Sequence, residues 1–159
     1  MEDVVVSGVA LTEDEAKVTL FNVPDRPGVA AKIFAKLAQA NINIDMIIQN
    51  KTQTKTTDIS FTVFKNELLR ALPVVKAVAR QIGAKNITCD EHIAKVSVVG
   101  VGMRSHSGIA SKMFGALARK RINIDMISTS EIKISCVVDG MKGKEAARVI
   151  HKEFGLGGK

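Results

Sequence analysis

A loop near the start of the sequence combines a carboxylate with the expected beginning of a helix. Asp25 shortly precedes Gly28, and from Ala30 onward apolar residues recur at helical spacing. A helix N-terminus offers unpaired backbone N–H groups and the positive end of the helix dipole, so it can hold a carboxylate. Gly28 would let a ligand approach the backbone closely. Because Asp25 could pair with an ammonium beside that anion site, the segment Asp25–Ala30 is a candidate amino-acid site.

The same residues also have a purely structural interpretation. Asp25 would cap the helix, Pro27 would begin it, and Gly28 would make the turn. The sequence alone leaves both interpretations open.

A second candidate position lies at the expected start of the strand that follows each such helix. Asn43-Ile44 in the first half of the chain has a twin in Asn123-Ile124. An asparagine in an apolar run can hydrogen-bond a ligand, or it can be a turn residue that leaves the helix. The polar runs Gln49-Asn50 and Ser128-Thr129-Ser130 follow the same strands and could close a pocket.

The twin asparagines belong to an internal repeat. Residues 42–47 read Ile-Asn-Ile-Asp-Met-Ile, and residues 122–127 repeat these six residues. Each copy alternates strand and helix patterns in the order βαββαβ, which is the ferredoxin-like split βαβ arrangement. The predicted fold class is therefore α+β, with two tandem ferredoxin-like units, each an antiparallel sheet covered by helices on one face.

Hydrophobic periodicity places the elements of each copy. In the first copy it predicts strands near Val18–Leu20, Asn41–Ile48, Ile59–Val63 and Ile87–Cys89, a polar hairpin loop Gln49–Thr57, and helices Ala30–Ala38 and Leu68–Ile82, the second ended by Gly83. In the second copy it predicts strands Lys95–Val101, Ile122–Ile127 and Ile132–Val138, and helices near Ile109–Lys120 and Lys144–Phe154.

The second copy lacks a fourth strand, because only a short glycine-rich tail follows Phe154. Residues 4–11 form an apolar strand pattern with no role in the first copy. We therefore expect residues 12–91 to form the first domain and residues 92–159 the second, the latter completed by strand 4–11.

Composition argues against several other classes of protein. The formal net charge is +7, but Lys and Arg are spread along the chain, so neither nucleic acid nor a membrane is an expected partner. No apolar run approaches the ~20 residues that span a bilayer. The N-terminus has no signal-peptide pattern, and Cys89 and Cys136 lie in apolar alternating runs. We expect both to be buried thiols in a cytoplasmic protein.

Catalytic and metal-binding patterns are missing from the sequence. His92, His106 and His151 are isolated from one another, and Gly100-Val-Gly102 does not continue as a dinucleotide-binding loop. Asp45 and Asp125 occur once in each copy, which favours a structural or ligand-binding role over an acid–base pair. We predict no catalytic residues, no metal and no cofactor.

The segment Pro-Asp-Arg-Pro-Gly (24–28), its helix, and Asn-Ile-Asn-Ile-Asp-Met-Ile (41–47) resemble an ACT domain. The pair of copies resembles the regulatory part of aspartate kinases, most specifically in residues 57–62, 99–106 and 127–135. The resemblance implies a chain without the kinase domain, either a β subunit of an α₂β₂ enzyme or a piece of a longer chain. It would not be an enzyme by itself.

This resemblance implies feedback inhibition in lysine, threonine and methionine synthesis, with threonine and possibly lysine as effectors. It also implies a homodimer through ACT–ACT pairing and association with the catalytic α subunit. One effector site would use Asp25, Gly28, Val29, Ala30 and Gln49 of one copy, faced by Asn123 and Ile124. The second would use Met103, Ser105, His106, Gly108, Ile109 and Ala110, with Asn43, Ile44, Asp45, Ser128, Thr129 and Ser130. No residue of the second copy matches Asp25, so the second ligand must be held differently or the site is empty.

Two rival functions share the fold. One is a stand-alone amino-acid-binding regulator of another enzyme or of transcription, which copurification with a kinase subunit would separate. The other is a ferredoxin-like RNA-binding protein, which reads RNA with exposed aromatic residues on its sheet. Phe61 falls in register with Ile59 and Val63 as a core residue, which argues against RNA binding.

Overall fold

The computed structural model describes residues 5–101 and 106–156, and the chain divides into two compact units. The inserted unit is Asp14–Glu91. The split unit comprises the described residues up to Glu13 together with those from His92 onward. Within these residues each unit has one four-stranded antiparallel sheet and two α-helices, which confirms the predicted α+β ferredoxin-like fold.

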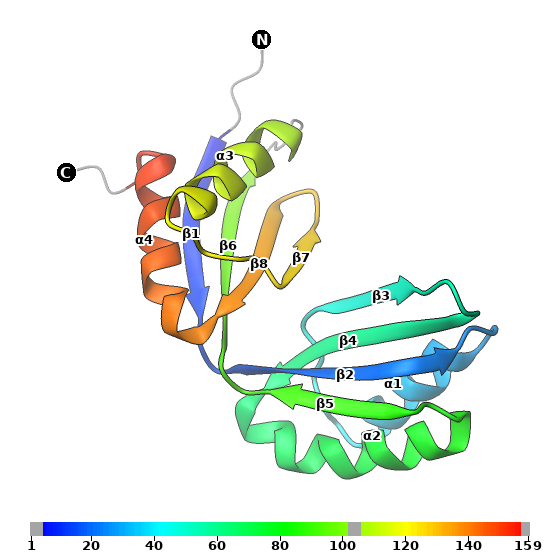
Figure 1. Cartoon of the computed structure of the whole chain (residues 1–159). Helices are drawn as coiled ribbons and strands as arrows, with labels where there is room; N and C mark the ends of the chain where they lie inside the picture. Colours follow the sequence, from blue (N-terminus) through cyan, green and yellow to red (C-terminus); the bar gives the residue numbers. More distant parts are fainter. Residues whose placement is uncertain (1–4, 102–105, 157–159) are drawn as a thin grey trace. The chain divides into compact units, whose positions relative to one another are not determined.

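The inserted unit contains the first copy of the repeat. Its sheet has the strand order β3-β4-β2-β5, and α1 and α2 cover one face of it (Figure 1). The elements are β2 (Glu15–Pro24), α1 (Val29–Gln39), β3 (Ile47–Lys51), β4 (Thr56–Phe64), a 3₁₀ turn η1 (Lys65–Glu67), α2 (Leu68–Ile82) and β5 (Asn86–Asp90).

The split unit has the equivalent arrangement, with strand order β1-β6-β8-β7. Strand β1 pairs antiparallel with β6, at the place that β5 holds beside β2 in the inserted unit. The elements are β1 (Val5–Thr12), β6 (Ile93–Val101), α3 (His106–Arg119), β7 (Met126–Thr129), β8 (Lys133–Asp139), a 3₁₀ turn η2 (Gly140–Lys142) and α4 (Gly143–Glu153).

Each core lies between its sheet and its helices and is almost entirely aliphatic. In the inserted unit Leu20 and Phe61 point from the sheet toward Ile33 of α1, and all three are fully buried. Alternation along β2 and β4 and the helical spacing of α1 direct these side chains to the same layer. The ring of Phe34 packs edge-to-face on Phe61, with centroids 5.5 Å apart. The burial of Phe61 agrees with its predicted place in the core.

The strand predicted at Asn41–Ile48 was wrong in its limits. Asn41 has φ 57° and ends the turn after α1, and regular pairing begins only at Ile47. Before it, the Met46 N–H donates to the Thr62 hydroxyl at 3.0 Å, an irregular contact that no hydrophobic pattern records. β3 then continues to Lys51, so the expected loop Gln49–Thr57 shrinks to the tip of a hairpin. The strand is polar because it is an exposed edge of the sheet.

The split unit departs from prediction in the same way. Arg121 also has φ 57°, and β7 begins at Met126 although the expected strand was Ile122–Ile127. The Asp125 N–H donates to the Val137 oxygen at 2.8 Å, as the Asp45 N–H does to the Thr62 oxygen at 3.1 Å.

The expectation of two buried cysteines was half wrong, because Cys136 is buried whereas Cys89, on the edge strand β5, is exposed.

Candidate functional site

The loop between β2 and α1 is set by an irregularity at the end of β2. Pairing with β4 shifts between Leu20 and Val23, and Asn22 takes the left-handed φ of 54° that Asn tolerates better than most residues. The Asp58 carboxylate accepts a hydrogen bond from the Asn22 N–H at 3.0 Å and fixes this bulge. Pairing resumes at Val23 and Pro24, so the loop leaves the sheet at a defined point.

The N-terminus of α1 has no side-chain cap. Gly28 is the N-cap residue with φ 91°, and α1 begins at Val29. The structural interpretation of the loop was therefore right about Gly28 as the turn and wrong about Asp25 and Pro27. Asp25 lies three residues before the N-cap, whereas a capping side chain contacts the first-turn N–H groups from the N-cap position itself. The Val29 N–H donates to the Arg26 oxygen at 3.4 Å, so the positive end of the helix is available to an anion through the first-turn N–H groups that follow Val29.

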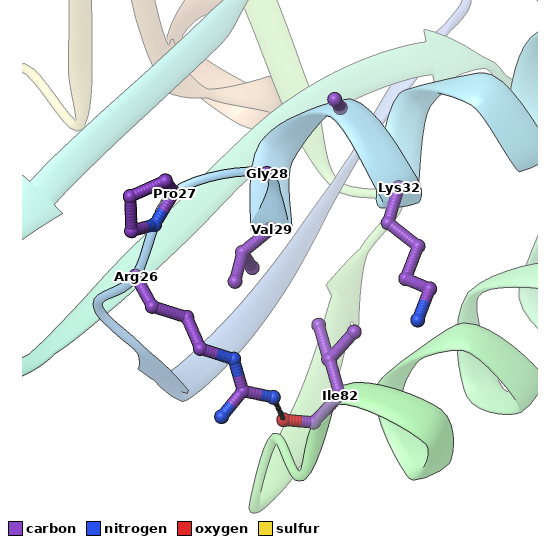
Figure 2. A pocket seen from close by; sticks show the side chains of 7 residues that line it. Arg26, Pro27, Gly28, Val29, Lys32 and Ile82 are labelled. Carbon is purple, nitrogen blue, oxygen red and sulfur yellow. Dashed lines mark hydrogen bonds between the residues drawn. The ribbon is translucent and has the colours of Figure 1, made fainter.

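A hollow of about 380 Å³ opens beside this helix end. Figure 2 shows the Arg26 side chain extending across it to Ile82, the last residue of α2, whose carbonyl oxygen accepts from the guanidinium at 3.4 Å. The side chain of Lys32 points into the same space from the end of the first turn of α1 (Figure 2). Two cations and the positive end of α1 favour a carboxylate ligand there, and the Ile82 carbonyl at the end of α2 offsets part of this charge through its hydrogen bond with Arg26. It is lined by Arg26, Pro27, Gly28, Val29, Ala31, Lys32 and Ile82.

Asp25 stands at the other side of the loop, next to the β3–β4 hairpin. Its backbone N–H donates to the Lys55 oxygen at 3.2 Å, and its carboxylate lies 3.4 Å from the Lys51 ammonium. Gln49 lies two residues before Lys51 on β3 and pairs with Ile59, so the side chains of Gln49 and Lys51 are on the same face of the strand. That Asp25 and Gln49 contribute to one site stays a prediction.

Val29 and Ala30 are the first two residues of α1 and belong to the first predicted site. The Val29 side chain is only 7% exposed and belongs to the core of the inserted unit, and Ala30 is half-buried. The Val29 N–H donates to the Arg26 oxygen at 3.4 Å, so the main-chain N–H that could reach a ligand is that of Ala30 and not of Val29. A ligand contact through the backbone would leave the side chain free to pack, so such a residue would look like an ordinary core residue in the sequence.

The remaining residues of the first predicted site, Asn123 and Ile124, lie in the split unit. Asn123 is exposed, and Ile124 is half-buried and packs on the split-unit core. Their burial repeats that of Asn43 and Ile44 in the inserted unit, where Asn43 is exposed and Ile44 packs on the core. Asp45 is exposed beside them. Both asparagines are therefore exposed residues that follow the turns at Asn41 and Arg121, and whether they bind a ligand stays a prediction.

The second predicted site is described only in part. Met103 and Ser105 lie outside the described residues, and of His106 only the backbone, as the first residue of α3, is described. Gly108 is exposed in the first turn of α3, Ile109 is buried and Ala110 half-buried. Ser128 and Thr129 lie on β7, and the Ser130 N–H closes the turn onto Lys133 at 2.7 Å. The residues before α3 that would face a ligand are those of which nothing is described.

Four other features of residues 5–101 and 106–156 bear on function: metal ligands, membrane-spanning helices, the Cys136 thiol and a second hollow. No group of three possible metal ligands occurs in this part of the chain. Nor does it contain a helix of the length and apolarity needed to cross a membrane. Burial raises the pKa of the Cys136 thiol from 9.0 to about 12, so this thiol is unreactive at neutral pH. A hollow of about 340 Å³ between α3 and α4, lined in part by Arg119, Lys120 and Lys152, contains none of the predicted site residues.

Sequence reasoning missed Lys51 and Lys32. Lys32 follows Gly28 by one helical turn, so its place beside the helix end could have been read from helical spacing. Lys51 reaches Asp25 only because β3 continues to its position and pairs with β4. No local pattern signals that contact.

The sheet order, the helices on one face and the glycine-initiated first helix define the class of protein. Two family models described as ACT domain match residues 17–83 and 96–154. The chain is thus a tandem pair of ACT domains.

Relatives that match almost the whole chain include aspartokinases and regulatory subunits of aspartate kinase. An aspartokinase of Pseudomonas aeruginosa is 52% identical over 156 residues, which are 98% of this chain and 38% of that protein. The regulatory subunit of aspartate kinase from Thermus thermophilus, in its ligand-free form, is 41% identical with a TM-score of 0.88, and the match covers 94% of this chain and 98% of that one. A structure of aspartokinase alpha and beta subunits gives 47% identity and a TM-score of 0.88, covering 96% of this chain and 100% of that one.

The chain belongs to the family of aspartate kinase regulatory subunits and regulatory regions, which confirms the resemblance found in the sequence. It spans 38% of the length of the aspartokinases that it matches. The described residues form the two ACT units, and the kinase domain of those relatives is not among them.

Proposed function

We propose that this chain is the amino-acid sensor of an aspartate kinase and that threonine binds at the N-terminus of α1. The observation that carries the proposal is the pairing of opposite charges at this loop. The uncapped helix end at Gly28, with Arg26 and Lys32 beside the hollow, suits the carboxylate of an amino acid. The Asp25 carboxylate, whose side chain is 30% exposed, suits its ammonium. The hollow of about 380 Å³ is large enough for the carboxylate end of a small amino acid, and the ammonium would have to extend beyond its lining residues to Asp25, the neighbour of Arg26 in the chain.

We further propose that lysine occupies the pseudo-symmetric site of the split unit when both effectors act together. Ser128, Thr129 and the segment Asn43–Asp45 would contribute to it. Support is limited to the repeat itself, since burial along residues 41–50 and 121–130 follows the same pattern. Because the sequence before α3 differs from the sequence before α1, the second site would bind a different amino acid from the first.

The proposal includes a homodimer formed by side-by-side pairing of ACT domains and a complex with a catalytic α subunit. The edge strands β3 and β7 carry Ile47 and Ile127 at equivalent repeat positions, and these side chains are 53% and 41% exposed. An edge strand with an exposed apolar residue favours pairing with another chain. One related structure is of aspartokinase alpha and beta subunits together, which supports the partner assignment. The proposal places the chain in the cytoplasm with that enzyme.

Inhibition of aspartate phosphorylation would arise by linkage. Effector binding at the α1 loop stabilises one arrangement of the paired ACT domains, and that arrangement favours an inactive kinase. A coupling free energy of about 1–3 kcal/mol, which is typical of allosteric proteins, would change kinase affinity or activity about 5- to 150-fold.

The test is a thermal-shift screen of the 159-residue chain against the twenty amino acids, followed by calorimetric titration. Threonine at ~100 times its Kd should add about 2.7 kcal/mol to the free energy of unfolding. Asp25→Asn should lose most of this gain, because the ammonium loses its counter-charge. Asp14→Asn, the same change at an exposed aspartate of the same unit, should keep it. If no amino acid raises the melting temperature, or if Asp25→Asn responds like the wild type, the proposed site is wrong.

A further inference from the structure

The carboxylate proposed to bind the effector already has a cationic partner within its own unit. The Lys51 ammonium lies 3.4 Å from the Asp25 carboxylate. The Lys51 side chain is 76% exposed and that of Asp25 only 30% exposed. The more solvent-accessible partner is therefore the lysine, and the less exposed partner is the aspartate that the effector would need.

The ion pair is not needed to hold the hairpin together. The tip closes by the Thr52 N–H donating to the Thr56 oxygen at 2.9 Å, and the hydroxyls of these two threonines lie 2.6 Å apart. The hairpin is also tied to the loop through the backbone, since the Asp25 N–H donates to the Lys55 oxygen. Removing the Lys51 charge should leave these bonds intact, so Lys51 can leave Asp25 without unfolding the tip.

An exposed ion pair of this kind is weak enough to be displaced. Such pairs commonly contribute about 0.2–1 kcal/mol, because water screens the charges and the long side chain loses freedom. An amino acid whose carboxylate is already held at the helix end has its ammonium close to Asp25. This high effective concentration favours the ligand ammonium over that of Lys51. Asp25 cannot hold both cations in the same position at full strength, so the two compete.

We propose that Lys51 is a built-in competitor for the effector ammonium at Asp25. In the effector-free protein it neutralises the carboxylate, and effector binding releases its ammonium into solvent. That release removes the ion pair between the hairpin tip and the α1 loop and leaves the backbone bond from Asp25 to Lys55. The second copy has no equivalent of this pair, since it lacks a match for Asp25 and its edge strand β7 ends at Thr129, before the position that Lys51 holds in β3. The inference rests on the proposed function, because it concerns the same site.

The experiment compares threonine binding to Lys51→Gln and Lys55→Gln by calorimetric titration of the 159-residue chain. Both variants remove one positive charge from the same hairpin, but the contact of Lys55 with the loop is through its backbone oxygen. We expect Lys51→Gln to bind threonine about two- to five-fold more tightly, which matches loss of a competing pair of ordinary strength. Lys55→Gln should bind like the wild type.

The outcomes separate the two proposals. If the wild type binds no amino acid, the proposed function fails. If the wild type binds threonine but Lys51→Gln binds it equally or more weakly, the competitor role is refuted and the sensor function stands. Weaker binding would mean that Lys51 holds the ligand carboxylate instead.

A second measurement detects the release of Lys51 directly. The rate at which an amine-labelling reagent modifies each lysine is followed by peptide mass spectrometry, with and without threonine. Because the amine of free threonine also consumes the reagent, the Lys51 rate is divided by the Lys55 rate of the same sample, and we expect threonine to raise this ratio. A ratio that is unchanged or lower with threonine bound would contradict displacement.

Discussion

Replacing Gly143 with alanine should destabilise the split unit by overpacking. Gly143 is the buried first residue of α4 and has an ordinary helical φ of −59°, so alanine would cost nothing in backbone conformation. A Cβ at this position would lie 2.5 Å from the Cβ of Ala94 on β6 and 3.3 Å from Cδ1 of Leu11 on β1. Carbon atoms pack at roughly 3.5–4.0 Å, so α4 would have to move outward by about 1 Å.

The expected magnitude follows from that displacement. Overpacking a tight core contact commonly costs about 1–3 kcal/mol. For a unit of this size each kcal/mol corresponds to a shift of roughly 4–8 °C, so we expect the melting temperature to fall by roughly 10 °C. The matched control is Gly115→Ala in α3, where the new Cβ would meet only the end of the Arg119 side chain at 3.5 Å. That variant should be stabilised, by about 0.4–1 kcal/mol, because alanine suits a helix better than glycine.

The assay is chemical denaturation of the four chains of a double-mutant cycle. Ala94→Gly removes the opposing methyl group, so the double variant should be less destabilised than the sum of the two single changes by at least about 1 kcal/mol. If Gly143→Ala proves as stable as Gly115→Ala, or if Ala94→Gly gives no relief, then α4 does not pack on β6 as described and the reasoning fails.

Three further predictions concern backbone conformation and pH. Gly28→Ala should lower the free energy of unfolding by about 1–2 kcal/mol, because alanine would have to adopt φ 91°. Nothing lies within 4 Å of the added methyl group, so the loss would come from the backbone alone. Calorimetry that finds no loss would contradict the left-handed N-cap. Arg121→Asn should stabilise the split unit by up to about 1 kcal/mol, since Asn41 holds the equivalent left-handed position in the inserted unit; equal denaturation midpoints would count against it. The folded protein keeps the Cys136 proton above pH 9, where the unfolded chain loses it, so stability should fall between pH 9 and about 12 by up to about 1.4 kcal/mol per pH unit. Denaturation of Cys136→Ala across the same pH range should show a shallower decline, and identical slopes would argue that the thiol is not desolvated.

Much of the fold is encoded in local patterns. The alternation of Val18 and Leu20 and the helical spacing of Ile33 and Leu37 place each side chain on one face of its element, and all four are buried as the pattern predicts. Periodicity works here because burial on one face is a property of a single strand or helix. The repeat of residues 42–47 as 122–127 then extends the same architecture to the second unit.

The elements that periodicity misplaced are the exposed edges. β3 and β7 begin later than the apolar runs suggest, because the preceding residues hydrogen-bond irregularly to the neighbouring strand. A polar edge strand such as Ile47–Lys51 buries little, so it leaves no alternating signal. The same exposure explains Cys89, whose alternating neighbours suggested a buried thiol.

The sequence by itself determined the two ferredoxin-like units and their aliphatic cores, and it predicted the loop before α1 as an amino-acid site. Only the tertiary structure decided that the helix end at Gly28 stays uncapped and that Lys51 reaches Asp25. It also decided that Gly143 meets Ala94. These contacts join residues far apart in the chain, and their existence depends on strand register and helix placement. Residue type and spacing determine which secondary structure each segment favours, whereas strand register and helix placement determine which segments come into contact.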